Sequence, residues 1–290
     1  MKSKIILGTV QFGLNYGINN SDGQIHEAEV IEILDLCKES NISTLDTAAA
    51  YGTSEERIGN YFELCGHAKD FRVITKFSLK NGLSMMDSLN HSLGKLKVDC
   101  VDTIMFHNFD DFKNTNTKEL DALLEHKGKK FLKLGISLYT NEQMNEVCDL
   151  GIFNVIQAPF NALDNYNLRG DVMVKLKEKG IETHTRSVFL QGLFFMNLNN
   201  IPSKLKPLEK YLKKLDELTN DFKISKEALA LQYVMSRDYI DGVLIGVDSS
   251  KQLKTNLETM HLNVSKDVFN AIDSIVVNES ELLNPAIWHQ

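Results

Sequence analysis

The sequence predicts an α/β protein built as one closed (β/α)8 barrel with extra helices near the C-terminus. Eight short apolar runs typical of strands alternate with longer segments that have helical periodicity. The chain has no Pro-, Gly- or Ser-rich stretch that would mark a linker. Its 290 residues suit one such barrel, which typically takes about 250. We therefore expect residues 1–290 to form a single domain of the TIM-barrel class.

The first half of the chain supplies four predicted strands and the helices that follow them. The strands are Lys4–Gly8, a run that ends at Asp46, Phe71–Phe77 and Val101–His107. The helices are His26–Ser40, a segment that begins at Ser54, Ser84–Lys97 and a segment around Leu120–Leu124. In the first of these helices, apolar residues recur at positions i, i+3, i+4 and i+7, which places them on one face. The segments Thr9–Gly17 and Asn108–Asn116 are expected to be loops.

The second half repeats this alternation and then adds helices. The predicted strands are Phe131–Ser137, Phe153–Ala158, Ile181–Val188 and Gly242–Gly246. The predicted helices are Thr140–Leu150, Asp171–Lys179, Leu208–Phe222, Ser225–Arg237, Ser250–Met260 and Lys266–Val277. The longest predicted loop, Phe189–Pro207, mixes aromatic residues with asparagines. Loops of this length in compact domains are usually functional or disordered, and the aromatic residues favour a functional loop.

Composition excludes several classes of protein. The net charge is −7 and no basic block occurs, so we expect no nucleic-acid partner. No apolar run approaches the ~18 residues of a membrane span, and the start of the chain lacks the apolar core of a signal peptide. The four cysteines are widely spaced without a C-x-x-C motif, which indicates reduced thiols in a cytoplasmic protein. We expect no metal site, and a monomer rather than a dimer.

Three predicted strands end in side chains that could share a site. Asp46, Lys76 and His107 close consecutive strands, at intervals of about 30 residues, the length of one strand–helix–strand unit. Parallel strands of a barrel deliver their last side chains to one rim, where barrel enzymes carry their active sites. Tyr51 follows the first of these strands in a turn of small residues. We therefore expect these four side chains to converge.

Such a group of side chains suits the reduction of a carbonyl. A carbonyl that accepts hydride develops negative charge on oxygen and needs a proton. A phenol can donate it, but the ordinary tyrosine pKa of about 10 is high, and a nearby ammonium group lowers that pKa. Asp46 would keep the Lys76 ammonium charged and oriented, and His107 would hold the carbonyl oxygen. The alternative is that each residue is an ordinary solvated residue of the rim.

These residues resemble the catalytic tetrad of the aldo-keto reductase family, which the resemblance places on Asp46, Tyr51, Lys76 and His107. The run Leu7–Thr9 also looks like the opening strand of that family. The resemblance extends over most of the chain, and it implies a reductase that binds NADP(H) or NAD(H). No GxGxxG motif follows the first strand, so a Rossmann fold is disfavoured.

The resemblance also implies residues that bind nicotinamide. Ser137 and Gln157 match positions that contact the carboxamide, although Leu138 stands where the family usually has asparagine. Arg186 stands where many members place an aromatic residue that stacks on nicotinamide. The positive charge of Arg186 would disfavour binding of the oxidised, cationic nicotinamide ring. Alternatively, Arg186 binds a polar substrate or forms an ion pair with a carboxylate at the rim of the barrel. The segment that follows contributes Ser187, Leu190 and Gly192.

A segment at the last strand resembles the family's cofactor-phosphate segment. Its candidate residues are Ile245, Gly246, Asp248, Ser249, Gln252 and Asn256. Backbone N–H groups at the helix start can hold phosphate, and Asn256 could reach adenine. Many members carry Lys or Arg where Asp248 stands, and an aspartate would repel a 2′-phosphate. Members of the family usually use NADP(H), whereas the aspartate at position 248 favours NAD(H). On balance we expect NADP(H).

The expected function is the NAD(P)H-dependent reduction of an aldehyde or ketone, with Tyr51 as the general acid and a keto-sugar as the first candidate substrate. The pocket is expected to draw on Phe12, Tyr16, the Asn108 region, Phe189–Met196 and Trp288. One alternative is a non-enzymatic, cofactor-binding regulatory subunit that resembles potassium-channel beta subunits. Another is a lyase or isomerase that uses Lys76 as a Schiff base.

Overall fold

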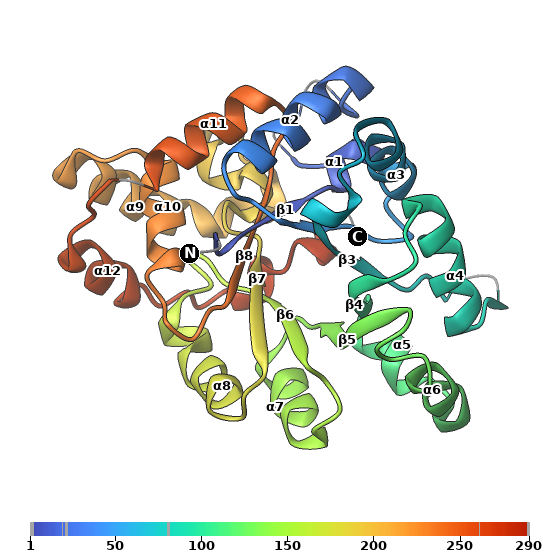
Figure 1. Ribbon diagram of the computed structural model, residues 1–290. Helices are drawn as coiled ribbons and strands as arrows, with labels where there is room; N and C mark the ends of the chain where they lie inside the picture. The colour runs from blue at the N-terminus through green and yellow to red at the C-terminus, as the bar shows by residue number, and fades with distance from the viewer. Residues whose placement is uncertain (1–2, 19, 21–22, 80–81, 261, 289–290) are drawn as a thin grey trace.

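A computed structural model describes residues 3–18, 20, 23–79, 82–260 and 262–288. Its eight strands form a closed barrel in which each strand is parallel to its neighbours and β8 pairs with β1. Figure 1 shows the strands at the centre and the helices around them. The predicted (β/α)8 class is therefore confirmed.

The strands are short and end at one rim of the barrel. They are β1 Ile5–Gly8, β2 Thr44–Asp46, β3 Arg72–Lys76, β4 Val101–Phe106, β5 Phe131–Ser137, β6 Val155–Pro159, β7 Glu182–Arg186 and β8 Gly242–Gly246. In the register of the sheet, Gly8 pairs with both Asp46 and Gly246, and Ser137 pairs with Gln157. The carboxyl ends of these strands are thus level with one another, which brings their last side chains together.

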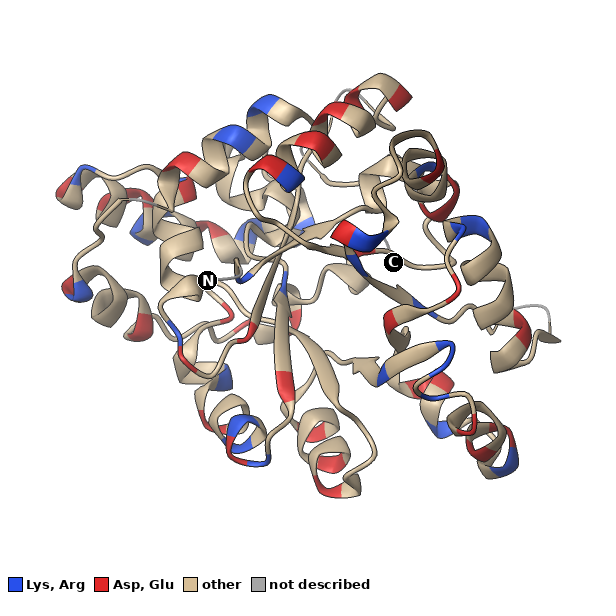
Figure 2. Cartoon of the chain, viewed as in Figure 1, with Lys and Arg blue, Asp and Glu red and all other residues tan. Residues whose placement is uncertain are grey.

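The α-helices surround the barrel. They are α1 Val10–Gly13, α2 Glu27–Glu39, α3 Ser54–Cys65, α4 Met85–Leu96, α5 Phe109–Lys113, α6 Thr117–Leu124, α7 Asn141–Leu150, α8 Tyr166–Glu178, α9 Glu209–Phe222, α10 Lys226–Met235, α11 Ser250–Thr259 and α12 Lys266–Asp273. Charged residues of both signs are interspersed over them (Figure 2). None of the helices in the described ranges combines the length and apolar character needed to cross a membrane.

Side-chain alternation along the strands explains where the polar groups lie. A small apolar cluster, separate from the main core, is formed by Ile6, Ile74, Met105, Val155 and Leu244. Successive strand residues face opposite sides of a sheet, so the residue two positions further shares the face of each cluster member. Those residues are Gly8, Lys76, His107, Gln157 and Gly246. The carboxyl end of the barrel interior is therefore polar above an apolar layer.

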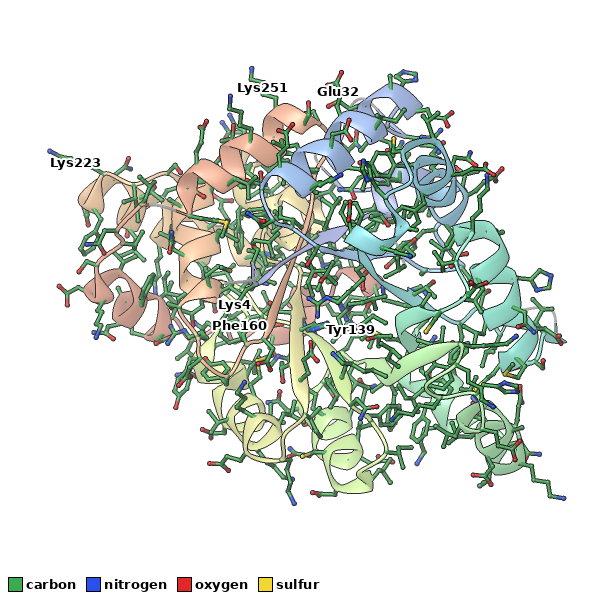
Figure 3. The ribbon with its side chains drawn as sticks, in the orientation of Figure 1. Lys4, Glu32, Tyr139, Phe160, Lys223 and Lys251 are labelled. Carbon is green, nitrogen blue, oxygen red and sulfur yellow. The ribbon has the colours of Figure 1, made fainter. Side chains whose placement is uncertain are left out.

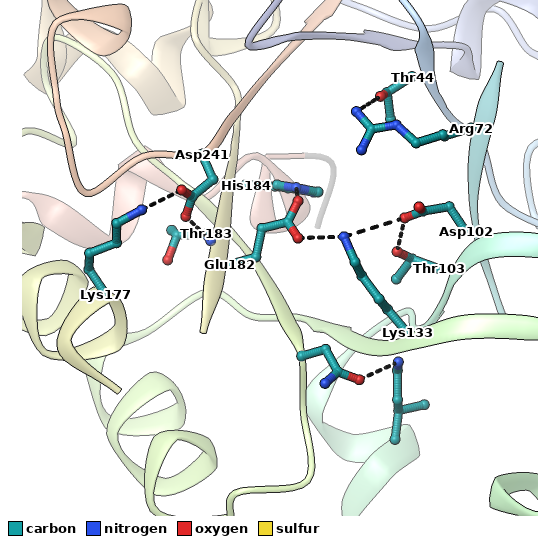
Figure 4. Close-up of polar contacts among 12 residues, drawn as sticks. Thr44, Arg72, Asp102, Thr103, Lys133, Lys177, Glu182, Thr183, His184 and Asp241 are labelled. Carbon is teal, nitrogen blue, oxygen red and sulfur yellow. Dashed lines mark hydrogen bonds and ion pairs between the residues drawn. The ribbon is translucent and has the colours of Figure 1, made fainter. Parts of the chain in front are cut away.

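The amino end of the barrel carries a second polar group, which we call the floor network (Figure 4). Lys133 Nζ lies 2.6 Å from Glu182 Oε2 and 3.8 Å from Asp102 Oδ2. The Glu182 Oε1 atom lies 2.8 Å from His184 Nε2. Nearby, Arg72 Nη2 donates to Thr44 Oγ1 at 2.8 Å. The floor network links side chains of β4, β5 and β7.

Two predicted helix boundaries were wrong, and Asn165 is involved at both. α8 begins at Tyr166 rather than Asp171, because Asn165 caps it by accepting from the Asn167 N–H. The last α-helix ends at Asp273 rather than Val277. There the Asn165 side chain donates to the carbonyls of Ile272 and Ile275, so these carbonyls have partners outside the helix.

The three predicted loops contain short helices. α1 lies within the segment after β1, and α5, capped by Asn108, lies in the segment after β4. The loop predicted over Phe189–Pro207 contains three 3-10 helices, at Leu190–Phe195, Leu198–Asn200 and Ser203–Leu208. Trp288 near the end of the chain is buried, and its Nε1 donates to the Leu282 carbonyl at 2.8 Å. The indole therefore packs against the preceding residues of the C-terminal segment, around Leu282.

Candidate active site

A buried ion pair lies at the carboxyl end of the barrel interior. Lys76 Nζ lies 2.6 Å from Asp46 Oδ1, and both residues are at most 2% exposed. The same ammonium group donates to the Thr47 carbonyl at 3.0 Å. The other carboxylate oxygen of Asp46 accepts from Gln157 Nε2 at 2.8 Å. A charge removed from water is tolerated when it is paired and hydrogen-bonded in this way.

Tyr51 and His107 lie next to this pair. Lys76 Nζ is 5.1 Å from the centre of the Tyr51 ring, and the His107 ring centre is 5.7 Å from it, edge to face. β2 and β3 deliver Asp46 and Lys76 as their last residues, whereas His107 comes one residue after β4. The structure thus brings together all four residues that the sequence pattern singled out.

Glycines hold the Tyr51 turn against α1. A Cβ atom on Gly13 would lie 1.7 Å from the Tyr51 carbonyl oxygen, so no other residue fits there without movement of the backbone. Gly52 has a φ of 55°, a left-handed conformation that glycine adopts readily. The turn is closed by hydrogen bonds from the Tyr51 N–H to the Ala48 carbonyl and from the Ser54 N–H to the Tyr51 carbonyl. These contacts fix the position from which the phenol projects.

The pKa of Tyr51 differs from the sequence-based expectation. Desolvation of the hydroxyl, followed by the negative charge of Asp46, raises this pKa above its ordinary value, while the positive charge of Arg186 lowers it. We expected Lys76 to lower the pKa, but its charge is balanced by Asp46 at 2.6 Å. A raised pKa favours the protonated form of the phenol, the form that can donate a proton.

The residues expected to bind nicotinamide line the same end of the barrel. Ser137 ends β5 and Gln157 lies in β6, and both are buried. Gln157 uses its Nε2 on Asp46. Arg186 ends β7, donates from Nη2 to the Leu138 carbonyl at 3.0 Å, and lies over Tyr139 with its Cζ 4.0 Å from the ring centre.

The segment after β7 has an unusual backbone. Ser187, Leu190, Gln191 and Gly192 have φ angles of 62°, 48°, 53° and 89°. Left-handed non-glycine residues each cost of the order of 1 kcal/mol and cluster at functional sites. The segment packs on the loop after β1, where Gln191 Nε2 donates to the Tyr16 hydroxyl at 2.8 Å and the Gln191 carbonyl accepts from the Ile18 N–H.

The N-terminus of α11 holds carboxylates in place of an open anion site. The Ser250 N–H donates to a carboxylate oxygen of Glu29 from α2, and Ser250 Oγ lies 3.3 Å from Glu32 Oε2. The Asp248 N–H donates to Gln252 Oε1, and Ser249 caps the helix by accepting from the Gln252 N–H. Figure 3 shows Glu32 and Lys251 projecting from neighbouring α2 and α11. These N–H groups already have acceptors within the protein.

Two further predicted residues lie near this segment. Ile245 is buried within β8, and Gly246 is exposed at its end. Asn256, which was expected to reach adenine, is only 3% exposed within α11.

Gln11 was missed by sequence reasoning. Its Oε1 atom is buried and has no hydrogen-bond partner among the described residues. A Cβ atom on Gly246 would lie 2.7 Å from Gln11 Nε2, so this amide packs closely against the glycine. A buried acceptor without a donor next to an exposed backbone fits a polar ligand along β8. The signal in the sequence was only a Gln in a glycine-bearing segment after a strand, which is too common to single it out.

At this end of the barrel, the unpartnered acceptor of Gln11 and the buried Ser137 and Gln157 fit an amide such as that of nicotinamide, whereas the N–H groups at the start of α11 are already bonded. Within the described ranges, no group of three or more His, Cys, Asp or Glu side chains converges in a way that could hold a metal ion.

Comparisons with known proteins agree with this geometry. The Aldo/keto reductase family matches residues 4–277. The aldo-keto reductase YhdN of Bacillus subtilis is 24% identical over 95% of this chain and 90% of its own length. The L-galactose dehydrogenase of Arabidopsis thaliana is 25% identical over 92% of this chain and 90% of its own length. The L-glyceraldehyde 3-phosphate reductase of Escherichia coli is 25% identical, but the match spans 61% of this chain and 58% of that protein.

A solved structure described as an aldo-keto reductase from Pseudomonas aeruginosa superimposes with a TM-score of 0.65 at 18% identity, covering 89% of each chain. At this identity the likeness concerns the fold. The match over residues 4–277, however, shows that the chain belongs to the aldo/keto reductase family. The expected enzyme class, an NAD(P)H-dependent oxidoreductase, is the class that this family defines.

Proposed function

We propose that this protein reduces an aldehyde or ketone with a nicotinamide cofactor and that Tyr51 is the general acid. The observation that carries the proposal is the buried Asp46–Lys76 pair, 2.6 Å apart, beneath the Tyr51 ring and next to His107. The pair, the desolvated phenol and the imidazole meet at the carboxyl end of the barrel, the end at which barrel enzymes carry their active sites, and this place supports a catalytic role.

Each residue has a defined task in this reaction. When bound, the cofactor supplies hydride to the carbonyl carbon. Tyr51 donates its proton to the carbonyl oxygen, and the positive charge of Arg186, which lowers the pKa of Tyr51, favours the phenolate that results. Asp46 keeps Lys76 charged, and His107 donates to the carbonyl oxygen and orients it.

Cofactor contacts are proposed at the carboxyl ends of five strands, β1 and β5 to β8. Ser137 and Gln157 would hold the carboxamide, and Gln11 would accept a hydrogen bond from the cofactor beside Gly246. The segments after β7 and β8 would contact the rest of the cofactor, with Ser187, Leu190, Gly192, Ile245, Ser249, Gln252 and Asn256 as the further candidates. Glu29, Glu32 and Asp248 put negative charge where a 2′-phosphate would be gripped, so we propose that NADH binds more tightly than NADPH.

The substrate is proposed to be a small polyhydroxylated carbonyl compound. Two relatives are named for L-galactose and L-glyceraldehyde 3-phosphate, which supports a sugar or sugar derivative. Tyr16, Gln191 and Tyr139 offer polar and aromatic groups of the kind that bind sugars. We further propose that residues 1–290 act as one domain, as a cytoplasmic monomer.

The decisive experiment follows the absorbance of NADH and NADPH with a panel of aldehydes and keto-sugars, for the native chain and for Tyr51→Phe. Tyr61→Phe is the matched control, because Tyr61 is a buried tyrosine that donates to Asp35 at 2.7 Å, away from the ion pair. We expect Tyr51→Phe to lose most of the rate and Tyr61→Phe to retain it.

Two other outcomes would contradict this proposal. If the native chain binds cofactor tightly but oxidises none of it, the regulatory-subunit alternative gains support. If borohydride traps a carbonyl compound on cofactor-free protein but not on Lys76→Met, Lys76 acts as a Schiff base instead.

A further inference from the structure

Arg186 is held in a fixed orientation at the mouth of the barrel. It ends β7, its guanidinium lies 4.0 Å from the centre of the Tyr139 ring, and its Nη2 donates to the Leu138 carbonyl at 3.0 Å. Figure 3 labels Tyr139 beside β5 and β6. Stacking on an aromatic face and one hydrogen bond fix the plane of a guanidinium.

This guanidinium forms no ion pair with any residue in the described part of the chain, and its side chain donates one hydrogen bond there out of the five N–H groups it carries. The nearby carboxylates are already engaged: Asp46 with Lys76, and Asp164 with Arg169 at 2.6 Å. One positive charge therefore remains at the mouth, although the chain as a whole carries −7.

Arg237 shows what a charge-balanced arginine looks like in this protein. It also lies on a tyrosine, with its Cζ 4.3 Å from the centre of the Tyr233 ring. Its Nη2, however, lies 2.9 and 3.0 Å from the two carboxylate oxygens of Asp273. Arg186 also stacks on a tyrosine ring, but no carboxylate in the described part of the chain pairs with it. Its guanidinium is therefore suited to bind an anionic ligand.

The charge of Arg186 also reaches the proposed chemistry. It lowers the pKa of the Tyr51 hydroxyl against the effect of desolvation. It does the same at Tyr16, whose pKa is nevertheless raised to about 12, mainly by desolvation. A group bound to Arg186 would thus lie within electrostatic reach of the proton donor.

We propose that Arg186 binds an oxyanion of the substrate, so that the substrates of this enzyme are carbonyl compounds that carry a phosphate or a carboxylate. A fixed planar guanidinium with unused N–H groups matches both oxyanions, which it can bind through two parallel hydrogen bonds. The inference depends on the reductase function proposed above. The rival interpretation is that Arg186 binds the diphosphate of the cofactor.

The test compares substrates that share a carbonyl and differ in charge. Glyceraldehyde 3-phosphate is paired with glyceraldehyde for the phosphate, and succinic semialdehyde with butanal for the carboxylate. We expect the native enzyme to prefer at least one charged member of the pairs in kcat/KM. In Arg186→Met this charged-to-uncharged ratio should fall about 10- to 100-fold, the usual effect of losing hydrogen bonds between charged groups. Arg186→Lys should retain part of it, and Arg237→Met should leave the ratio unchanged.

Equilibrium binding separates the two proposals. Glycerol 3-phosphate and succinate, which have no reducible carbonyl, are titrated into the enzyme saturated with NADH. Binding to the native protein that is lost in Arg186→Met supports the anion site, even if no carbonyl compound is turned over and the reductase proposal fails.

Three results would overturn the inference. The first is turnover of both members of each pair without preference for charge, which leaves the reductase function standing. The second is no binding of either anion. The third is an unchanged ratio in Arg186→Met together with a weaker Kd for NADH, which would assign Arg186 to the cofactor.

Discussion

At the scale of single residues, the Lys76 ammonium is the most constrained group in the site, because it is 1% exposed and depends on Asp46 for its charge balance. Removal of one partner from a buried pair leaves an uncompensated charge, which typically costs about 3–5 kcal/mol. We expect Lys76→Met to lose activity and to lower the free energy of unfolding by that amount, as measured by urea denaturation. Lys113→Met, which breaks an exposed pair with Glu146, should change it by about 1 kcal/mol or less. Equal losses in both variants would contradict this account of the pair.

Single carboxylates should also decide the choice of cofactor. Glu29 accepts from the Ser250 N–H, and Asp248 lies in the turn before α11. Each negative charge within several ångströms of a 2′-phosphate disfavours it by about 1 kcal/mol in a solvated site. We expect Glu29→Gln and Asp248→Asn each to tighten NADPH binding relative to NADH about fivefold, as measured by fluorescence titration. Glu39→Gln, at the other end of α2, is the control; a native Kd lower for NADPH than for NADH would show that the carboxylates do not select the cofactor.

At the scale of elements, the contact between α3 and α4 depends on a single glycine. A Cβ atom on Gly59 would lie 2.1 Å from the Lys95 carbonyl oxygen, whereas a Cβ atom on Gly94 in α4 would meet nothing within 4 Å. We expect Gly59→Ala to lower the free energy of unfolding by about 1–3 kcal/mol, because the helices must move apart. Gly94→Ala should raise it by up to about 1 kcal/mol, because alanine favours the helix. Thermal unfolding of both variants checks the opposite signs, and a stabilised Gly59→Ala would show that the two helices are not in close contact.

At the scale of the whole molecule, the floor network makes the stability of the barrel depend on acidity. The hydrogen bond to His184, followed by that to Lys133, lowers the pKa of Glu182 from 4.5 to about 2. A carboxyl group with a lowered folded-state pKa contributes stability above its unfolded pKa, and loses it as the pH falls through the folded value. We expect the free energy of unfolding to fall between pH 4.5 and about 2, and to fall less in Glu182→Gln. Urea denaturation across this range is the measurement, and identical slopes for the two proteins would exclude Glu182 as the source.

Much of the fold and of the site could be predicted from local patterns. The alternation of apolar runs with helical periodicity is a property of neighbouring residues, so it indicated the eight strands and the barrel. The strand ends at Asp46 and Lys76 followed from the same patterns. The end of the last α-helix could not be predicted, because the Asn165 side chain that binds the carbonyls there is far away in the chain. The start of α8, in contrast, depends on the local cap that Asn165 forms with the Asn167 N–H.

The sequence by itself determined the class of fold, the family, and which side chains meet at the carboxyl end of the barrel, because strand length and period assign each residue to a face and an end. Only the tertiary structure decided the electrostatic states of these groups. The pKa of Tyr51 rises because the phenol is desolvated and because the negative charge of Asp46 lies nearby. Arg186 keeps an unbalanced charge because the nearby carboxylates are already paired. Solvation and pairing depend on distances between residues from different strands, which no local pattern in the sequence contains.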